Sequence, residues 1–354
     1  MHMSVRFQPH AHMQNNTSLP HPEQNKRLHA TRLSFTLTRM RALITGINGF
    51  VGGHLADHLY ADGGWAVYGV ARQPSLALPH LREAVTLVVA DLEQPDAFDA
   101  MLADTQPDVI FHLAAQSNVP RSFADPQQTL HTNINVQLNL FQSLLRLKQN
   151  PIILIAGSQE IYGQVRPEEL PLDETTPLRP VNPYAVSKAT QDLLAYQFHI
   201  SHKLRTIRLR PFNHIGPRQS DAFVASAFAT QIARIERGQQ PPVIRVGNLT
   251  AERDFTDVRD MVRAYALAAI HGHVGTAYNI GAERAVSIRW MLDTLMTLST
   301  HDIRVEQDPA RMRPADVPRV VADCTLFRSH TGWEVHIPLE QTLNDILDDW
   351  RSKI

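Results

Sequence analysis

The chain has 354 residues and a formal net charge of -1, with a pI near 7.0, and its length allows a large core or one domain plus a smaller second one. The balanced charge gives no basic surface for nucleic acid and no polybasic membrane patch, and no apolar run reaches the roughly 18 residues of a spanning helix, so we expect neither partner. The single cysteine, Cys324, excludes an intrachain disulfide; this suits a reducing compartment among others, and we expect a cytoplasmic protein.

Residues 1–39 differ from the rest of the chain. They contain five histidines, one acidic residue (Glu23) and no clear periodicity. We interpret them as a disordered extension; a misassigned start before Met40, a tag remnant and an organelle transit peptide are the alternatives. The histidine spacings are irregular, so we predict no metal site.

From Arg41 onward, short apolar runs alternate with segments of helical periodicity. Strands are expected at 41–45, 65–71, 85–90, 109–114, 152–156 and 205–210. Helices lie between most of them, as at 136–147 and 188–199. This alternation predicts an α/β fold with a Rossmann-type, doubly wound parallel sheet, forming a dinucleotide-binding domain over 40–210.

After residue 211 the alternation loosens. Prolines and short polar loops accumulate, and a terminal helix is expected near 339–351. We predict that 211–354 is mainly a smaller, discontinuous substrate-binding portion, with some segments returning to the Rossmann domain.

A glycine pattern follows the first expected strand. In "TGINGFVGGHL", glycines recur as Gly-x-x-Gly-x-x-Gly before a helix. Such glycines permit a tight turn and close approach to a pyrophosphate at the helix N-terminus. A plain tight turn is the alternative, but the position between strand and helix favours dinucleotide binding. The expected cofactor contacts here are Gly46, Asn48, Gly49, Phe50, Val51 and Gly52.

The end of the second strand should select between the two nicotinamide dinucleotides. An acid there would favour NAD, but the chain reads "GVARQ" and offers Arg72. Arginine can pair with a 2'-phosphate, so NADP(H) is favoured and NAD(H) is possible; an exposed arginine that allows dual use is the alternative. Asp91 and Leu92 should lie near the adenine, with a helix N-cap as the other reading of Asp91.

The segment "NPYAVSKA" places Tyr184 and Lys188 one helical turn apart. Alone, such a pair is usually an ordinary helix face. It follows "TGINGFVG", "HLAAQSNV" and "GSQEIYG" in order, and with them the chain resembles the extended short-chain dehydrogenase/reductases that act on nucleotide sugars. The resemblance covers nearly all of residues 41–351.

Three later segments narrow the resemblance. "RPFNHIGPRQ", "VGNLTAERDFTDVRDMVRAY" and "DPARMRPADVPRVVAD" are similar to the GDP-4-dehydro-6-deoxy-D-mannose reductases, which make GDP-D-rhamnose. The GDP-mannose 4,6-dehydratases are also similar, but usually have Glu-Ser-Pro in place of "HIGP" and often threonine at the position of Ser158. We therefore expect NADPH-dependent reduction of the C4 ketone; the dehydratase, another nucleotide-sugar epimerase or dehydratase, and a non-catalytic dinucleotide-binding sensor are the alternatives.

The resemblance also implies catalytic roles. Tyr184 would be the proton donor, and a free tyrosine has a pKa near 10 that a neighbouring ammonium, from Lys188, should lower. Lys188 also holds the nicotinamide ribose in this family, and Ser158 can bond the sugar carbonyl oxygen. Glu160 is ambiguous, because the matching glutamate removes the C5 proton in dehydratases and is also present in similar reductases.

The same resemblance gives further contacts. The implied cofactor contacts are Leu113, Ala114, Ala115, Tyr184, Lys188 and Ile215. The implied contacts of the GDP-linked deoxy-keto sugar are Gln116, Ser117, Ser158, Asn213, Val246, Asn248, Arg253, Arg313 and Asp316, each with a salt bridge or loop cap as its alternative. We interpret His112 as a packed strand residue and leave His214 open between packing and site lining. A homodimer through a four-helix bundle is expected from the family.

Overall fold

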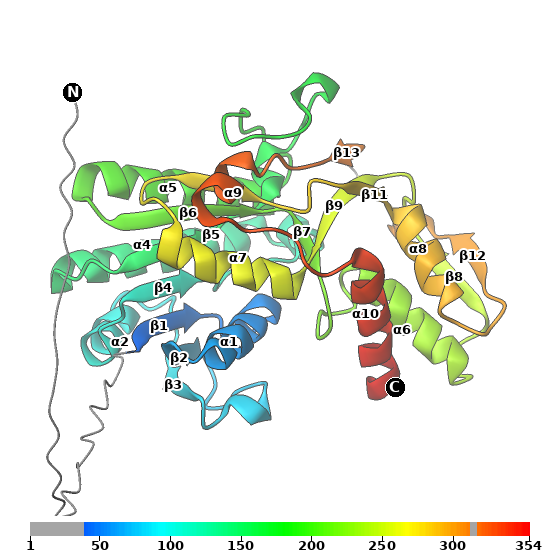
Figure 1. Ribbon diagram of the computed structural model, residues 1–354, viewed down its shortest axis with the longest axis horizontal. Coiled ribbons are helices and arrows are strands. Elements are labelled where there is room, and N and C mark those ends of the chain that lie inside the picture. The colour runs from blue at the N-terminus through cyan, green and yellow to red at the C-terminus, as the bar shows by residue number, and fades with distance from the viewer. Residues whose placement is uncertain (1–38, 312–316) are drawn as a thin grey trace, which may run out of the picture. The chain divides into compact units, whose positions relative to one another are not determined.

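The computed structural model of the protein describes residues 39–311 and 317–354. Its centre is a seven-stranded sheet in the order β10-β6-β5-β4-β1-β2-β3, with all neighbours parallel (Figure 1). The predicted Rossmann-type sheet is confirmed. Its strands are β1 (Met40–Thr45), β2 (Trp65–Ala71), β3 (Val85–Val89), β4 (Val109–His112), β5 (Ile152–Ala156), β6 (Arg205–Pro211) and β10 (Ala277–Ile280).

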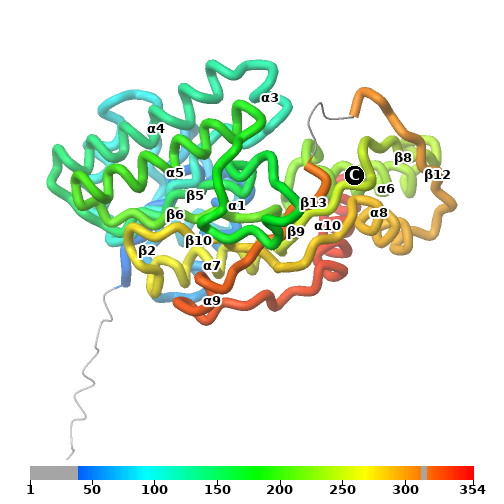
Figure 2. The backbone as a smooth tube through the Cα atoms, turned by 90° about the horizontal axis from the view of Figure 1, so that it is seen from above, coloured from blue at the N-terminus to red at the C-terminus, as the bar shows by residue number. Residues whose placement is uncertain are grey.

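Helices cover both faces of this sheet. One face carries α2 (Ala97–Thr105), α4 (Pro126–Leu147) and α5 (Pro183–His202); Figure 2 shows α4 and α5 side by side. The other carries α1 (Phe50–Asp62), α7 (Val258–His271) and the short α9 (Thr325–Thr331). Both faces are therefore buried, which explains why the strands read as continuous apolar runs.

Two of the helices begin earlier than the apolar periodicity predicted. Asp125 and Asn182 each accept a hydrogen bond from a backbone N–H of the first turn, and each is followed by proline. An Asp or Asn cap before a proline is a strong helix start. The predicted helices at 136–147 and 188–199 are thus the later parts of α4 and α5.

The C-terminal portion forms a second hydrophobic core. Helices α6 (Val224–Glu236), α8 (Ile288–Thr297) and α10 (Leu339–Lys353) pack together there. Small sheets adjoin them, made of β7 (Asn213–Ile215), β9 (Glu252–Asp257), β11 (Ala285–Ser287) and β13 (Arg319–Val320), and of β8 (Val243–Val246) with β12 (Arg304–Gln307). The short α3 (Val119–Ala124) precedes α4.

Strand β10 shows how the two portions interleave. It lies between α7 and α8 in the sequence, yet it pairs with β6 at the edge of the central sheet. The domain boundary near residue 210 stays a prediction. The expected extension at 1–39 falls, apart from Arg39, outside the described residues. Within 39–311 and 317–354, no helix is long and apolar enough to cross a bilayer.

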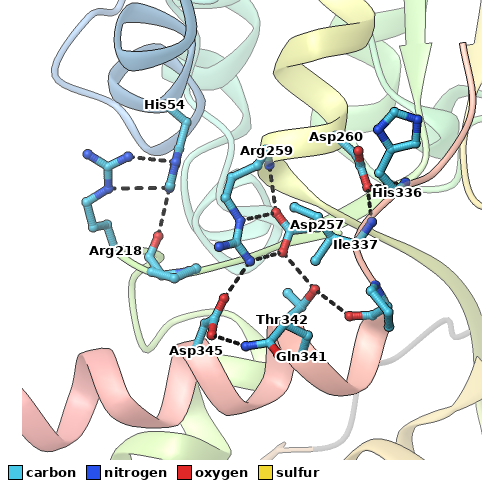
Figure 3. Close-up of polar contacts among 12 residues, drawn as sticks. His54, Arg218, Asp257, Arg259, Asp260, His336, Ile337, Gln341, Thr342 and Asp345 are labelled. Carbon is cyan, nitrogen blue, oxygen red and sulfur yellow. Dashed lines mark hydrogen bonds and ion pairs between the residues drawn. The ribbon is translucent and has the colours of Figure 1, made fainter. Parts of the chain in front are cut away.

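A buried carboxylate anchors α10 to the start of α7 (Figure 3). Asp257 ends β9, caps α7 by accepting from the Arg259 backbone N–H at 2.7 Å, and accepts from the Arg259 guanidinium. It also accepts from the Thr342 hydroxyl of α10 at 2.7 Å, while Arg259 reaches Asp345 of the same helix. Because β9 pairs with β7, this cluster fixes the strands that carry part of the expected site.

A neighbouring cluster in Figure 3 ties α1 to the segment after β7. His54 bonds the Pro217 carbonyl at 2.9 Å, and its other nitrogen faces the Arg218 guanidinium at 2.6 Å. Burial lowers the pKa of His54 to about 4, so the ring is neutral and can accept from Arg218. The helix that follows the glycine turn is thereby held against the C-terminal portion.

Replacing Asp257 should destabilise the fold. In Asp257→Ala the Arg259 guanidinium, the Thr342 hydroxyl and the first turn of α7 lose a shared acceptor, and breaking a buried pair costs about 3–5 kcal/mol. Arg289→Ala is the matched control, because the Arg289–Asp293 pair is exposed and 3.8 Å long and such surface changes stay within about 0.5 kcal/mol. Chemical denaturation measures both, and equal losses would contradict this role of Asp257.

Candidate active site

The turn after β1 has the shape of a phosphate cradle. Gly46 has φ +76°, and a Cβ added there would lie 3.1 Å from the Ala114 backbone. A Cβ on Gly52 would lie 2.2 Å from the Gly46 carbonyl oxygen. Only glycine fits at both positions, so the backbone can approach a ligand at the N-terminus of α1. The turn therefore fits the pyrophosphate of a dinucleotide.

Asn48 holds the segment after β2 against this turn. Its side-chain amide donates to the Ser75 carbonyl and its oxygen accepts from the Ala77 N–H, both at 2.8 Å. Arg72 is exposed directly after β2. In the structure Asn48 thus shapes the loop where the adenosine ribose is expected, and direct cofactor contacts of Asn48 and Arg72 stay predictions.

His112 supports the backbone at the end of β4. The Thr45 hydroxyl oxygen accepts from the Leu113 and Ala114 N–H groups, each at 3.1 Å, and lies 3.1 Å from His112 Nδ1. Because that oxygen already accepts twice, its proton points to Nδ1. Burial lowers the pKa of His112 to about 3, so it is a neutral, packed strand residue, as the sequence suggested.

Ser158, Tyr184 and Lys188 meet beyond the end of β5. Ser158 caps the short 3₁₀ helix η2 (Gln159–Tyr162) and accepts from the Glu160 N–H at 3.2 Å. A hydrogen bond from Ser158 favours the Tyr184 phenolate and so acts to lower its pKa. The Lys188 ammonium donates to the Ala156 carbonyl at 2.7 Å. The structure therefore brings together the three residues that the sequence singled out.

Burial sets the protonation of this group. Tyr184 is 9% exposed and Lys188 is 4% exposed. Desolvation raises the pKa of Tyr184 to about 12, with the Glu160 carboxylate acting in the same direction, and lowers the pKa of Lys188 to about 8. We expected the ammonium to lower the Tyr184 pKa; that was wrong for the protein alone, because burial raises this pKa and Lys188 is not among the groups that shift it, its ammonium donating to the Ala156 carbonyl instead. Tyr184 stays a phenol and can act as an acid.

Glu160 faces the other side of the group. Its carboxylate accepts from the Asn182 amide at 3.0 Å, and Asn182 also caps α5 through the Ala185 N–H at 2.8 Å. Asn182 therefore joins Glu160 to the helix that carries Tyr184. In the sequence, "NPY" indicated only that a helix starts at this point. The hydrogen bond from Asn182 to Glu160 was not predicted.

A cavity of about 230 Å³ opens from Glu160 into the C-terminal portion. Its wall includes β7, α6, β8 and β9. Four predicted substrate residues line it, and Ile215, predicted to contact the cofactor, lies there too. The four are Asn213, Val246, Asn248 and Arg253.

Ser158, a predicted substrate contact, does not line this cavity, and neither do Tyr184 and Lys188; two more predicted substrate residues also lie outside its wall. The Gln116 side chain bonds Asn118 and Thr129, at 2.5–3.1 Å, and stiffens the turn after β4. Ser117 is exposed beside it. Neither belongs to the cavity wall, and their contact with substrate stays a prediction. Arg313 and Asp316 lie outside the described residues.

Twelve further residues line the cavity; the sequence left His214 open between packing and site lining and assigned no role to the other eleven. His214 stacks on Phe50 with ring centroids 6.1 Å apart, and its Nδ1 bonds the Phe212 carbonyl at 3.0 Å; it therefore both packs and lines the site. Gln219 donates to the His214 carbonyl.

Arg245 and Arg311 add positive charge beside Arg253. Arg311 stands two residues before Arg313 in "RMRPAD", which was the available signal. Arginines so grouped suit a diphosphate.

Comparison with known proteins places the chain in a family. A family model described as GDP-mannose 4,6 dehydratase matches residues 43–346. The chain belongs to this family. The family lies within the extended short-chain dehydrogenase/reductases, whose members here include nucleotide-sugar reductases, dehydratases and epimerases.

Individual relatives of this family differ in activity. GDP-6-deoxy-D-mannose reductase of Pseudomonas aeruginosa is 38% identical over 315 residues, covering 89% of this chain and 98% of the relative. GDP-mannose 4,6-dehydratase of Vibrio cholerae is 28% identical, covering 86% and 92%. The solved structure of RMD from Pseudomonas aeruginosa complexed with NADPH superposes with a TM-score of 0.78 at 35% identity, covering 89% of this chain and 100% of that one.

Lys188 should give the activity an alkaline limb. In the predicted catalytic role, its charged form would stabilise the tyrosinate that remains when Tyr184 gives up its proton, and burial brings the pKa of Lys188 down to about 8. We expect kcat to be level below about pH 8 and to fall about tenfold per pH unit above it. Tyr184, with a pKa of about 12, keeps its proton in this range. A steady-state pH profile measures the limb, and Lys188→Met should lack it.

The contribution of Lys188 to fold stability should increase over the pH range in which kcat falls. The pKa of Lys188 falls from 10.5 to about 8 on folding. Between these values the unfolded chain binds more protons than the folded one, so the contribution of Lys188 to stability rises with pH. Melting curves recorded at the pH values of the activity profile separate the effect of Lys188 on stability from its effect on kcat. If the alkaline fall in kcat persists in Lys188→Met, that result would contradict the assignment of this fall to Lys188.

Proposed function

We propose that the protein is a cytoplasmic, NADPH-dependent reductase that converts the C4 ketone of GDP-4-dehydro-6-deoxy-D-mannose to the alcohol of GDP-D-rhamnose. The observation that carries the proposal is the buried phenol of Tyr184, paired with Ser158 and followed one turn later by Lys188. Ketone reduction needs an acid that is protonated at neutral pH, and a phenol with a pKa of about 12 meets that need.

Each residue has a separate task in this reaction. NADPH, bound along the glycine turn and the ends of β1 and β4, supplies the hydride. Ser158 donates a hydrogen bond to the ketone oxygen and Tyr184 delivers the proton to it. Lys188 keeps a positive charge beside the resulting tyrosinate. Arg253, with Arg245 and Arg311, neutralises the diphosphate in the cavity.

The relatives favour reduction over dehydration. The reductase relative is 38% identical and the dehydratase relative 28% identical, and both cover most of the chain. The segment after Asn213 reads "HIGP" rather than the Glu-Ser-Pro usual in dehydratases. One observation favours the GDP-mannose 4,6-dehydratase alternative: Glu160 lines the cavity and is held by Asn182, as a proton-removing base would need to be.

The cofactor proposal rests on two independent features. Arg72 directly follows β2, where an acid would favour NAD. The similar reductase structure is a complex with NADPH. A related UDP-glucose 4-epimerase structure from Thermus thermophilus, 27% identical with a TM-score of 0.79 and covering 89% and 100%, is a complex with NAD. We therefore infer a preference for NADPH, with NADH as a possible second cofactor.

A product assay tests the function directly. With GDP-4-dehydro-6-deoxy-D-mannose and NADPH, we expect loss of nicotinamide absorbance and a C4 alcohol by NMR. Tyr184→Phe is the matched control, because it removes one hydroxyl and should leave NADPH binding intact. Loss of general acid catalysis should lower its turnover by about 10²–10⁴-fold.

Two outcomes would contradict the proposal. Formation of the 4-keto product from GDP-mannose and NADP⁺, with no reduction of the keto sugar, would assign the dehydratase reaction. Unchanged turnover in Tyr184→Phe would remove the proposed acid. The stereochemistry of the alcohol, rhamnose or its C4 epimer 6-deoxytalose, is read from the same spectrum.

We also propose a homodimer through α4 and α5. The exposed side of α5 carries large apolar side chains at spacings of three, four and seven residues, as in a helix-packing seam. They are Val186, Leu193, Tyr196 and Ile200, 40–57% exposed. Helix α4 packs alongside α5, so two copies would bring four helices together.

Charge placed in this seam should separate the copies. Leu193 is 57% exposed in the single chain, so Leu193→Asp is compatible with the monomer fold but would bury a carboxylate in the dimer. Light scattering at micromolar concentration should give twice the chain mass for the wild type and the chain mass for the variant. Tyr60→Asp, at a 57% exposed position on α1, is the control and should stay dimeric. A monomeric wild type would contradict the dimer.

A further inference from the structure

Arg210 is a buried cation outside the cavity. It is the last but one residue of β6 and is 5% exposed. Its Nε and Nη2 donate to the two oxygens of Asp192 at 2.9 and 3.0 Å. Its Nη1 donates to the Tyr162 hydroxyl at 3.1 Å and to the Glu174 carbonyl at 2.9 Å. One guanidinium therefore joins three separate segments of the chain.

The first of these segments is the catalytic helix. Tyr184, Lys188 and Asp192 follow one another at intervals of four residues, so they share one face of α5. Asp192 is 1% exposed and is held bidentately by Arg210. This contact fixes how far α5 slides along the sheet and how it is rotated about its axis. The positions of the Tyr184 hydroxyl and the Lys188 ammonium follow from it.

The second segment is the turn that carries Ser158 and Glu160. Tyr162 is the last residue of η2, which Ser158 caps and which contains Glu160. Its ring is fully buried, and its hydroxyl donates to Asn279 at 2.6 Å while accepting from Arg210. Asn279 in turn donates to the Leu172 carbonyl at 2.8 Å. The turn is thus fixed to the same guanidinium as α5.

We propose that Arg210 is a positioning residue, which sets Ser158 and Glu160 against Tyr184 and Lys188 by bonding Tyr162 and Asp192 at once. The inference rests on the proposed reductase function and adds a requirement to it. Arg210 does not line the cavity and acts through the two elements that it joins.

The chemistry of the group explains why arginine is needed. Guanidinium is planar, and its donors point in fixed directions toward two sets of acceptors. Lysine would keep the charge, but its single ammonium cannot bond both Asp192 oxygens and also reach Tyr162. Such a fully bonded network inside the protein holds its members rigidly.

Arg208 provides a matched control two residues earlier on β6. It also pairs with Asp192, at 2.9 Å, and it donates to the Gly275 carbonyl at 3.2 Å. Within the described part of the chain, the side-chain hydrogen bonds of Arg208 go to Asp192 and Gly275 and none goes to η2. Arg208→Lys therefore alters the same carboxylate without disturbing the link between the two catalytic segments.

The experiment compares Arg210→Lys, Tyr162→Phe and Arg208→Lys in the full-length enzyme. Tyr162→Phe is included because it keeps the buried ion pair and the ring, so it should fold even if Arg210→Lys does not. We expect Arg210→Lys and Tyr162→Phe to lower kcat by about 10–100-fold, the order expected for a small misplacement of reacting groups. The NADPH dissociation constant should change little, and Arg208→Lys should keep its kcat.

A single-turnover measurement separates positioning from loss of folded enzyme. With enzyme and NADPH in excess over the keto sugar, the observed rate constant of NADPH oxidation reports hydride transfer in the folded molecules, and misaligned variants should lower it. A smaller folded fraction would lower the steady-state rate and leave this rate constant unchanged. An unchanged rate constant, or equal losses in Arg208→Lys and Tyr162→Phe, would overturn the inference. An inactive wild type would overturn the proposed function and the inference together.

Discussion

The burial of Tyr184 and Lys188 at the end of β5 determines what this site can do. Desolvation penalises the charged form of each side chain, so the phenol keeps its proton and the ammonium holds its own less tightly. A phenol beside an ammonium is suited to giving a proton to a ketone oxygen as hydride arrives. The electrostatics of the site thus suit the proton-donating role that the proposed reduction assigns to Tyr184.

The rest of the fold serves to hold this pair in place. The glycine turn admits a dinucleotide at the N-terminus of α1, and the Thr45–His112 pair supports the adjoining backbone. Asn182 links Glu160 to the start of α5, and Arg210 links the Ser158 turn to its middle. The carboxylate of Asp257 fixes β9 and α10, which complete the substrate side.

Local patterns predicted the sheet well; they also singled out Ser158, Tyr184 and Lys188, whose catalytic roles stay predictions. Six of the central strands were expected within a few residues, because apolar runs between turn signals are local features. The seventh, β10, was missed, since it is only the four-residue run "AYNI" and lies in the part of the sequence where the alternation of strands and helices loosens. The raised pKa of Tyr184, the packing of Gln116 and the Arg210 network depend on contacts between distant segments, and no spacing in the sequence reports them.

The proposed proton transfer requires Tyr184 to be a phenol at neutral pH. Ultraviolet difference spectra of wild type against Tyr184→Phe, titrated from pH 6 upward, isolate the tyrosinate of this one residue. We expect the two proteins to titrate identically up to about pH 10, the ordinary pKa of tyrosine. One additional tyrosinate in the wild type near pH 7 would contradict it, because Tyr184 would then be poised as a base.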